Sequence, residues 1–209
     1  MFTSRLQDWV RSGARRVVPA LRALHLTPNI LTMLGLCICA GSSVLIAFGF
    51  LLPGGLILLV ASGFDILDGA LARVSGREQR YGAFLDSTVD RYAEAMTAIA
   101  LLAYFIFLPG HHTLQPMLIV FALTGSLLVS YVRARAQSLG FNGDGGLLAR
   151  PERVVITVIG LVIAPLLIWS LWILAVLTNV TAVQRIWVVW QQARRMAAEG
   201  RAATGVPTA

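Results

Sequence analysis

The chain of 209 residues is 57% hydrophobic, and it carries 17 basic residues against 10 acidic ones. Apolar stretches of about 20 residues, the length that a helix needs to cross a bilayer, recur along the sequence and exclude a soluble domain. Every basic residue is an arginine. We interpret the net positive charge as a surface that faces anionic lipid, and we expect no nucleic acid as a partner.

The predicted elements are all helical. Arginines interleaved with apolar residues over 3–23 predict an amphipathic helix that lies in the membrane interface. Six membrane-spanning helices follow, over residues 29–50, 53–72, 81–108 and 114–137, with the last two sharing 147–190 and turning near Pro165. The sequence thus predicts an all-α polytopic membrane protein with one domain over 1–200, its six-helix bundle over 29–195, and a disordered tail over 201–209.

The charged residues indicate the orientation in the membrane. The turns near 50–54, 109–113 and 165–168 contain none, so the positive-inside rule places both termini and the charged loops in the cytoplasm. The last two spans are short. At about 1.5 Å of helix per residue, Arg153 lies roughly 18 Å and Arg185 roughly 25 Å from the turn near Pro165. Both guanidinium groups are therefore expected within the hydrocarbon level.

Four aspartates fall in or beside apolar segments. Asp65 and Asp68 are three residues apart and share a helix face, while Gly82, Asp86 and Asp90 step by four along the next helix. Four converging carboxylates repel one another unless cations join them. Mg²⁺ prefers such ligands together with substrate phosphates, and two ions can clamp the oxygens of a phosphoryl transfer.

Two other interpretations of the aspartates stay open at this point. Asp–Arg pairs can simply hold helices together, and an intramembrane carboxylate can belong to an ion or proton path. An ion or proton transporter is therefore the alternative outside the enzymes. Transporters often contain internal repeats, and the sequence shows no convincing one.

The stretch from Asp65 to Asp90 reads D-x-x-D-G-x-x-A-R, eight residues, then G-x-x-x-D-x-x-x-D. This pattern resembles the signature of the CDP-alcohol phosphatidyltransferases without departure, and the resemblance covers most of the chain. It implies a cell-membrane enzyme with a cytoplasmic active site, a homodimer, and transfer of a phosphatidyl group from CDP-diacylglycerol to an alcohol with release of CMP.

The resemblance also implies residue roles. One Mg²⁺ ion would bind Asp65, Asp68 and Asp86, and a second would bind Asp65, Asp86 and Asp90, with Mn²⁺ as the alternative metal. Asp90 would also take the proton from the acceptor hydroxyl as the catalytic base. The residues expected to bind or make room for the CDP-lipid are Asn29, Thr32, Gly69, Ala72, Arg73 and Gly82.

A second basic set concerns the acceptor. Arg133, Arg153 and Arg185, expected at buried depth, suit a phosphate dianion through forked contacts and favour a phosphorylated alcohol over serine or choline. The run "SYVRARA…GDGG…RPER" followed by "VQR" resembles the branch that makes phosphatidylinositol phosphate from inositol 1-phosphate, although Arg133 stands where that branch has lysine. Phosphatidylglycerophosphate synthase, which uses glycerol 3-phosphate, is the alternative.

Three further charged residues have two interpretations each. Arg135 and Arg150 either belong to the acceptor site or are cytoplasmic charges of the positive-inside kind. Glu94 either supports the metal ligands or pairs with Arg91 or a neighbouring helix.

Overall fold

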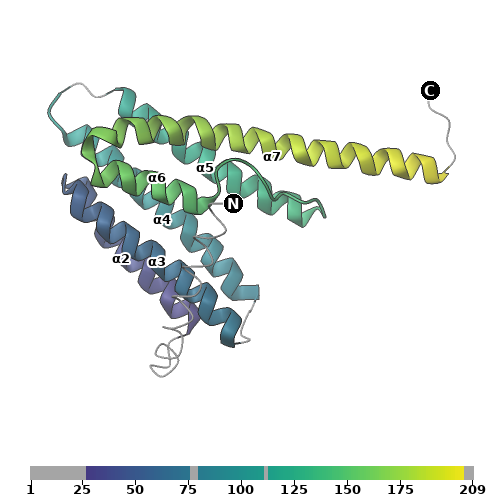
Figure 1. Ribbon diagram of the computed structural model, residues 1–209, viewed down its shortest axis with the longest axis horizontal. Helices are drawn as coiled ribbons and strands as arrows, with labels where there is room; N and C mark the ends of the chain where they lie inside the picture. Colours follow the sequence, from purple (N-terminus) through teal and green to yellow (C-terminus); the bar gives the residue numbers. More distant parts are fainter. Residues whose placement is uncertain (1–26, 76–79, 111–112, 205–209) are drawn as a thin grey trace.

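The computed structural model describes residues 27–75, 80–110 and 113–204, and within them the fold is entirely helical, as predicted (Figure 1). The helices are α2 (Pro28–Ala47), α3 (Leu51–Ser75), α4 (Arg80–Phe107), α5 (Leu114–Ser138), α6 (Arg150–Val162), the short 3₁₀ helix η1 (Ala164–Leu166) and α7 (Leu167–Thr204). These helices lie close to the six predicted spans. The predicted interfacial helix over 3–23 lies outside the described residues.

Local sequence explains where the helices begin and end. At the start of α2, the Thr27 side chain accepts a hydrogen bond from the backbone N–H of Ile30, and Pro28 occupies the first turn, where a missing N–H costs nothing. Gly49, with φ of 86°, makes the short turn between α2 and α3. Pro165 lies in η1 and separates α6 from α7.

The described helices make this a membrane protein. Four of the helical segments, 28–47, 51–69, 114–138 and 164–198, are long and apolar enough to cross a bilayer. The other two α-helices in the described ranges depart from that simple profile for visible reasons. Between residues 86 and 94, α4 carries Asp86, Asp90, Arg91 and Glu94, and α6 has only 13 residues.

The last helix corrects one expectation. The helix α7 has 38 residues and ends at Thr204, so residues 201–204 are helical and do not belong to the predicted tail. Alanine-rich sequence near this end explains the extension, because alanine is the best helix former. At about 1.5 Å per residue α7 is roughly 57 Å long, nearly twice the hydrocarbon thickness, and it projects well past the other helices (Figure 1).

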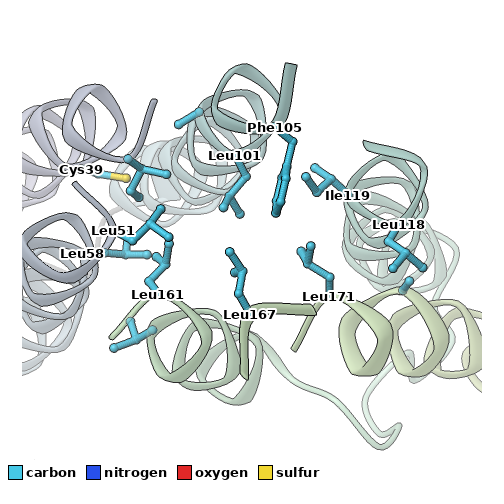
Figure 2. Packing of buried hydrophobic residues seen from close by; sticks show 14 of the residues in the cluster. Cys39, Leu51, Leu58, Leu101, Phe105, Leu118, Ile119, Leu161, Leu167 and Leu171 are labelled. Atoms are coloured by element: carbon cyan, nitrogen blue, oxygen red, sulfur yellow. The ribbon is translucent and has the colours of Figure 1, made fainter. Parts of the chain in front are cut away.

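The apolar core gathers around the second half of α4. Leu101 and Phe105 of α4 face Ile119 of α5 and Leu171 of α7, while Leu161 of α6 lies beside Leu51 and Leu58 of α3 (Figure 2). Around this core α2 packs on α3 and α4, α3 on α6, α4 on α5, and both α5 and α6 on α7. The packing leaves the charged first half of α4 in the same bundle as the charged end of α3.

Two helices approach closely at a glycine. A Cβ atom added at Gly125 of α5 would lie 2.9 Å from the backbone nitrogen of Asn179 in α7, closer than real contacts allow. The Asn179 side chain crosses the same contact and donates a hydrogen bond of 3.0 Å to the Phe121 carbonyl. The α5–α7 interface therefore requires a residue without a side chain at position 125.

We predict that Gly125→Ala lowers the free energy of unfolding by roughly 1–3 kcal/mol, because the added methyl group overpacks the contact. Gly41→Ala is the matched control, since nothing lies within 4 Å of a Cβ at Gly41. There the gain in helix propensity makes the change neutral or stabilising. Thermal unfolding in detergent measures both variants, and equal stability of the two would contradict the prediction.

Candidate active site

Three of the four aspartates converge. Asp65 and Asp68 on α3 and Asp86 on α4 each offer a carboxylate oxygen, and these oxygens all lie within 4.8 Å of one another. Asp68 is buried, and the other two are half-buried. Hard carboxylate oxygens at this separation fit a divalent ion such as Mg²⁺ or Mn²⁺, which would relieve their repulsion.

The start of α2 forms a wall of this site. The Thr32 hydroxyl donates a hydrogen bond of 2.6 Å to Oδ2 of Asp68. A Cβ atom at Gly82 would lie 3.3 Å from Oδ1 of Asn29, so α2 and α4 are close at the signature glycine. Asn29 and Thr32, both predicted to line the donor pocket, therefore lie beside the signature residues.

Asp90 takes a different position from the other three aspartates. Its carboxylate is buried and forms ion pairs of 2.8 Å with Nη2 of Arg150 and 3.3 Å with Nη1 of Arg91. Arg150 also reaches Asp65, with Nη1 2.6 Å from Oδ2. The structure thus places a guanidinium group between Asp65 and Asp90, where the family resemblance implies a shared metal ion.

Arg150 is the functional candidate that sequence reasoning left undecided. It is the first residue of α6, and it precedes Arg153 by three residues, so both lie on the same helix face. The three-residue spacing from Arg153, which was expected to be buried, is the feature of the sequence that could have indicated a role for Arg150. Its partners come from α3 and α4, and only the packing of α6 against α3 reveals them.

The buried Arg153 pairs with a carboxylate inside the bundle. Its Nη2 lies 2.6 Å from Oε1 of Glu94, and the Ser126 hydroxyl donates a hydrogen bond to Oε2 of the same carboxylate. Glu94 therefore forms an ion pair with an arginine of a neighbouring helix, which is one of the two roles considered for it from the sequence. The contact joins α4, α5 and α6.

The other two predicted acceptor arginines contact the loop 139–149. Arg185 is buried. Its Nε donates a hydrogen bond of 2.8 Å to the Gly145 carbonyl, and its Nη1 donates one of 2.7 Å to the Val129 carbonyl. Arg133 is instead exposed, which corrects the expectation of a buried side chain. The loop brings Asp144 to it, at 2.8 Å from Nε.

The remaining signature residues are placed only in part. Gly69 follows Asp68 on α3 and is half-buried. Ala72 and Arg73 belong to the same helix, and their side chains lie outside the described residues.

A cavity of about 100 Å³ lies between the helices. Glu94 and Leu101, two turns apart on α4, both line it, so it passes from a charged end to an apolar one. The charged lining residues are Asp65, Glu94, Arg150 and Arg153. The cavity therefore adjoins both the aspartates and the buried arginines.

Comparison with known proteins agrees with this geometry. Residues 25–190 match the sequence model of the CDP-alcohol phosphatidyltransferase family. The phosphatidylinositol phosphate synthase of Mycobacterium tuberculosis is 37% identical over 191 residues, covering 85% of this chain and 87% of that protein. The archaetidylinositol phosphate synthase of Methanothermobacter thermautotrophicus is 37% identical over 184 residues, covering 85% and 90%.

Solved structures of the M. tuberculosis synthase have the same fold. The crystal structure with CDP-DAG bound has a TM-score of 0.79 at 33% identity and covers 85% of this chain and 93% of that one. The complex with manganese and citrate has a TM-score of 0.80 at 33% identity, with coverage of 85% and 88%. The chain described here belongs to the CDP-alcohol phosphatidyltransferase family.

Proposed function

We propose that this protein transfers the phosphatidyl group of CDP-diacylglycerol to inositol 1-phosphate, giving phosphatidylinositol phosphate and CMP. The observation that carries the proposal is the convergence of Asp65, Asp68 and Asp86 in a bundle that also buries Arg153 and Arg185. Carboxylates supply a metal site for the pyrophosphate, and arginines supply a site for a second phosphate. A transporter would not need both.

The metal site in this proposal would hold two Mg²⁺ ions, with Mn²⁺ as a substitute. Asp65, Asp68 and Asp86 would bind one ion, and Asp65, Asp86 and Asp90 would bind the other. Bound metal polarises the pyrophosphate of the donor lipid. The manganese in the related synthase structure and the close carboxylates of this chain support a metal requirement.

Asp90 acts as the general base that removes the proton from the acceptor hydroxyl. It lies one helical turn from Asp86, so its carboxylate can approach the same reacting group. The donor pocket is formed by Asn29, Thr32, Gly69, Ala72, Arg73 and Gly82. The contacts of Thr32 with Asp68 and of Asn29 with Gly82 support this pocket.

The acceptor phosphate binds Arg133, Arg153 and Arg185. The loop 139–149 contacts all three side chains: Asp144 contacts Arg133, Leu148 contacts Arg153, and Gly145 contacts Arg185. Inositol 1-phosphate is favoured because the similar proteins are inositol phosphate lipid synthases by name. Glycerol 3-phosphate carries the same anionic group and is the competing acceptor.

In the membrane, the six helices α2 to α7 cross the bilayer, and both termini and the active site face the cytoplasm of the cell. The positive-inside distribution of arginines supports this orientation. The short α6 then starts within the hydrocarbon level, which explains why Arg150 and Arg153 both have carboxylate partners. We propose a homodimer as the assembly, on the basis of the family resemblance.

We predict that the purified protein releases CMP from CDP-diacylglycerol with Mg²⁺ and inositol 1-phosphate, and that EDTA abolishes the release. Arg185→Ala should raise the KM for inositol 1-phosphate about 10- to 100-fold, the effect of losing a charged hydrogen bond. Arg135→Ala is the matched control, because Arg135 is exposed and, among the described residues, its side chain bonds only Ser138 of its own helix. A preference for glycerol 3-phosphate over inositol 1-phosphate would contradict the assigned acceptor.

We further predict that Asp90→Asn lowers kcat by at least 10²-fold, since an amide cannot take the acceptor proton. CMP release under saturating substrates measures this loss. Asp144→Asn serves as the control: it removes an exposed carboxylate that contacts Arg133, so its effect should fall on the KM for the acceptor, and most of the kcat should be retained. Full activity of Asp90→Asn would show that the base is wrongly assigned.

A further inference from the structure

Arg150 forks across two of the aspartates. Nη1 lies 2.6 Å from Oδ2 of Asp65 on α3, and Nη2 lies 2.8 Å from Oδ1 of Asp90 on α4. The side chains are only 23%, 17% and 12% exposed, in the order Arg150, Asp65 and Asp90. The contact with Asp65 is a hydrogen bond, whereas the contact with Asp90 is an ion pair, because Oδ1 of Asp90 has no hydrogen-bond partner among the described residues. A planar guanidinium can serve both carboxylates, because its charge is delocalised over both Nη atoms.

The hydrogen bonds of Arg150 differ from those of the other buried arginines. Arg153 also reaches the Leu148 carbonyl, and Arg185 is held by two backbone carbonyls. Arg150 contacts the two aspartates through its Nη atoms, and no backbone carbonyl holds its guanidinium in the part of the chain that the structure describes. The buried Nε atoms of Arg150 and Arg153 both lack a hydrogen-bond partner there, so the difference lies in the Nη contacts. Its guanidinium is therefore anchored by the carboxylates themselves.

Charge balance indicates that the carboxylates can anchor Arg150 only while the second metal ion is not bound. Asp65 and Asp90 are the pair that, in the function proposed above, belongs to the second ion. Two divalent ions alone would balance the four aspartates, so a guanidinium in the same place would be surplus positive charge. If these carboxylates bound a metal cation while the guanidinium kept its present position, the two positive charges would repel each other strongly in a site of low dielectric.

We propose that Arg150 is an internal counter-ion that occupies the Asp65–Asp90 pair in the absence of the second metal ion, and that the ion must displace it to bind. The inference rests on the proposed two-ion site. Arg150 stabilises the metal-free bundle by joining α3, α4 and α6. It does so at the cost of affinity for the second ion, because both cations compete for the same oxygens.

Linkage makes the competition measurable. Coupling of this kind changes an affinity by about 5- to 150-fold, and the effect is reciprocal between the two partners. Removing the guanidinium should therefore tighten the weaker of two metal sites by a factor on the order of ten. The stronger site, formed by Asp65, Asp68 and Asp86, should change much less, because Arg150 contacts only one of its three ligands.

The first experiment titrates the full-length, metal-stripped protein in detergent with Mn²⁺ and follows free Mn²⁺ by electron paramagnetic resonance. We expect one tight and one weak site in the wild type, and a weak site about tenfold tighter in Arg150→Gln. Arg150→Lys keeps the charge without the fork and should fall between them. Arg135→Gln, which removes an exposed charge, should match the wild type.

The second experiment measures thermal unfolding of the same proteins with and without Mn²⁺. Without metal, Arg150→Gln should unfold at a lower temperature than the wild type, because Asp65 and Asp90 lose their counter-ion. Saturating Mn²⁺ should largely close that gap. Equal destabilisation with and without Mn²⁺ would make Arg150 a structural brace and overturn the proposal.

The outcomes separate this inference from the proposed function. Unchanged Mn²⁺ affinity in Arg150→Gln, with a wild type that binds two ions and releases CMP, overturns only the counter-ion role. The same follows if Arg150→Lys matches the wild type, because the general positive field would then explain the effect. A wild type that binds no second ion and releases no CMP overturns both.

Discussion

The structure depends on supporting several carboxylates inside a helical bundle that lies in a membrane. An ionised group at this depth is expensive unless an opposite charge or a hydrogen-bond donor accompanies it. The described contacts supply that support from other helices: Thr32 of α2 bonds Asp68, and Arg150 of α6 joins Asp65 to Asp90. The electrostatics of the site thus determine which helices must be neighbours.

The bundle separates this polar chemistry from its apolar packing along the length of α4. Asp86, Asp90 and Glu94 lie in the part of the helix up to its middle, and Leu101 and Phe105 lie in the part that follows, in the core (Figure 2). The separation allows one helix to carry ligands at one end and hold the bundle together at the other. The cavity beside it has the same division, charged near Glu94 and apolar near Leu101.

Sequence reasoning predicted what depends on local pattern and missed what depends on contacts between distant segments. Hydropathy and turn residues located the helices, and the spacing of Asp65, Asp68 and Asp86 anticipated their convergence. The exposure of Arg133 could not be predicted, because it follows from the path of the loop that carries Asp144. Arg150 and Asp65 are 85 residues apart in the sequence, and helical periodicity relates only residues within the same helix, so it could not predict this contact.

The backbone contacts of Arg185 have a consequence for the affinity of this side chain for an anion. Arginine has about 2 kcal/mol of rotamer entropy to lose when it is immobilised, and the carbonyls of Gly145 and Val129 remove much of that freedom during folding. In the function proposed above, the acceptor phosphate would meet a side chain that is already pre-organised. The loop that supplies the Gly145 carbonyl would then contribute to the affinity together with the arginine, and Gly146, with φ of 104°, adopts a backbone conformation that residues with side chains rarely take.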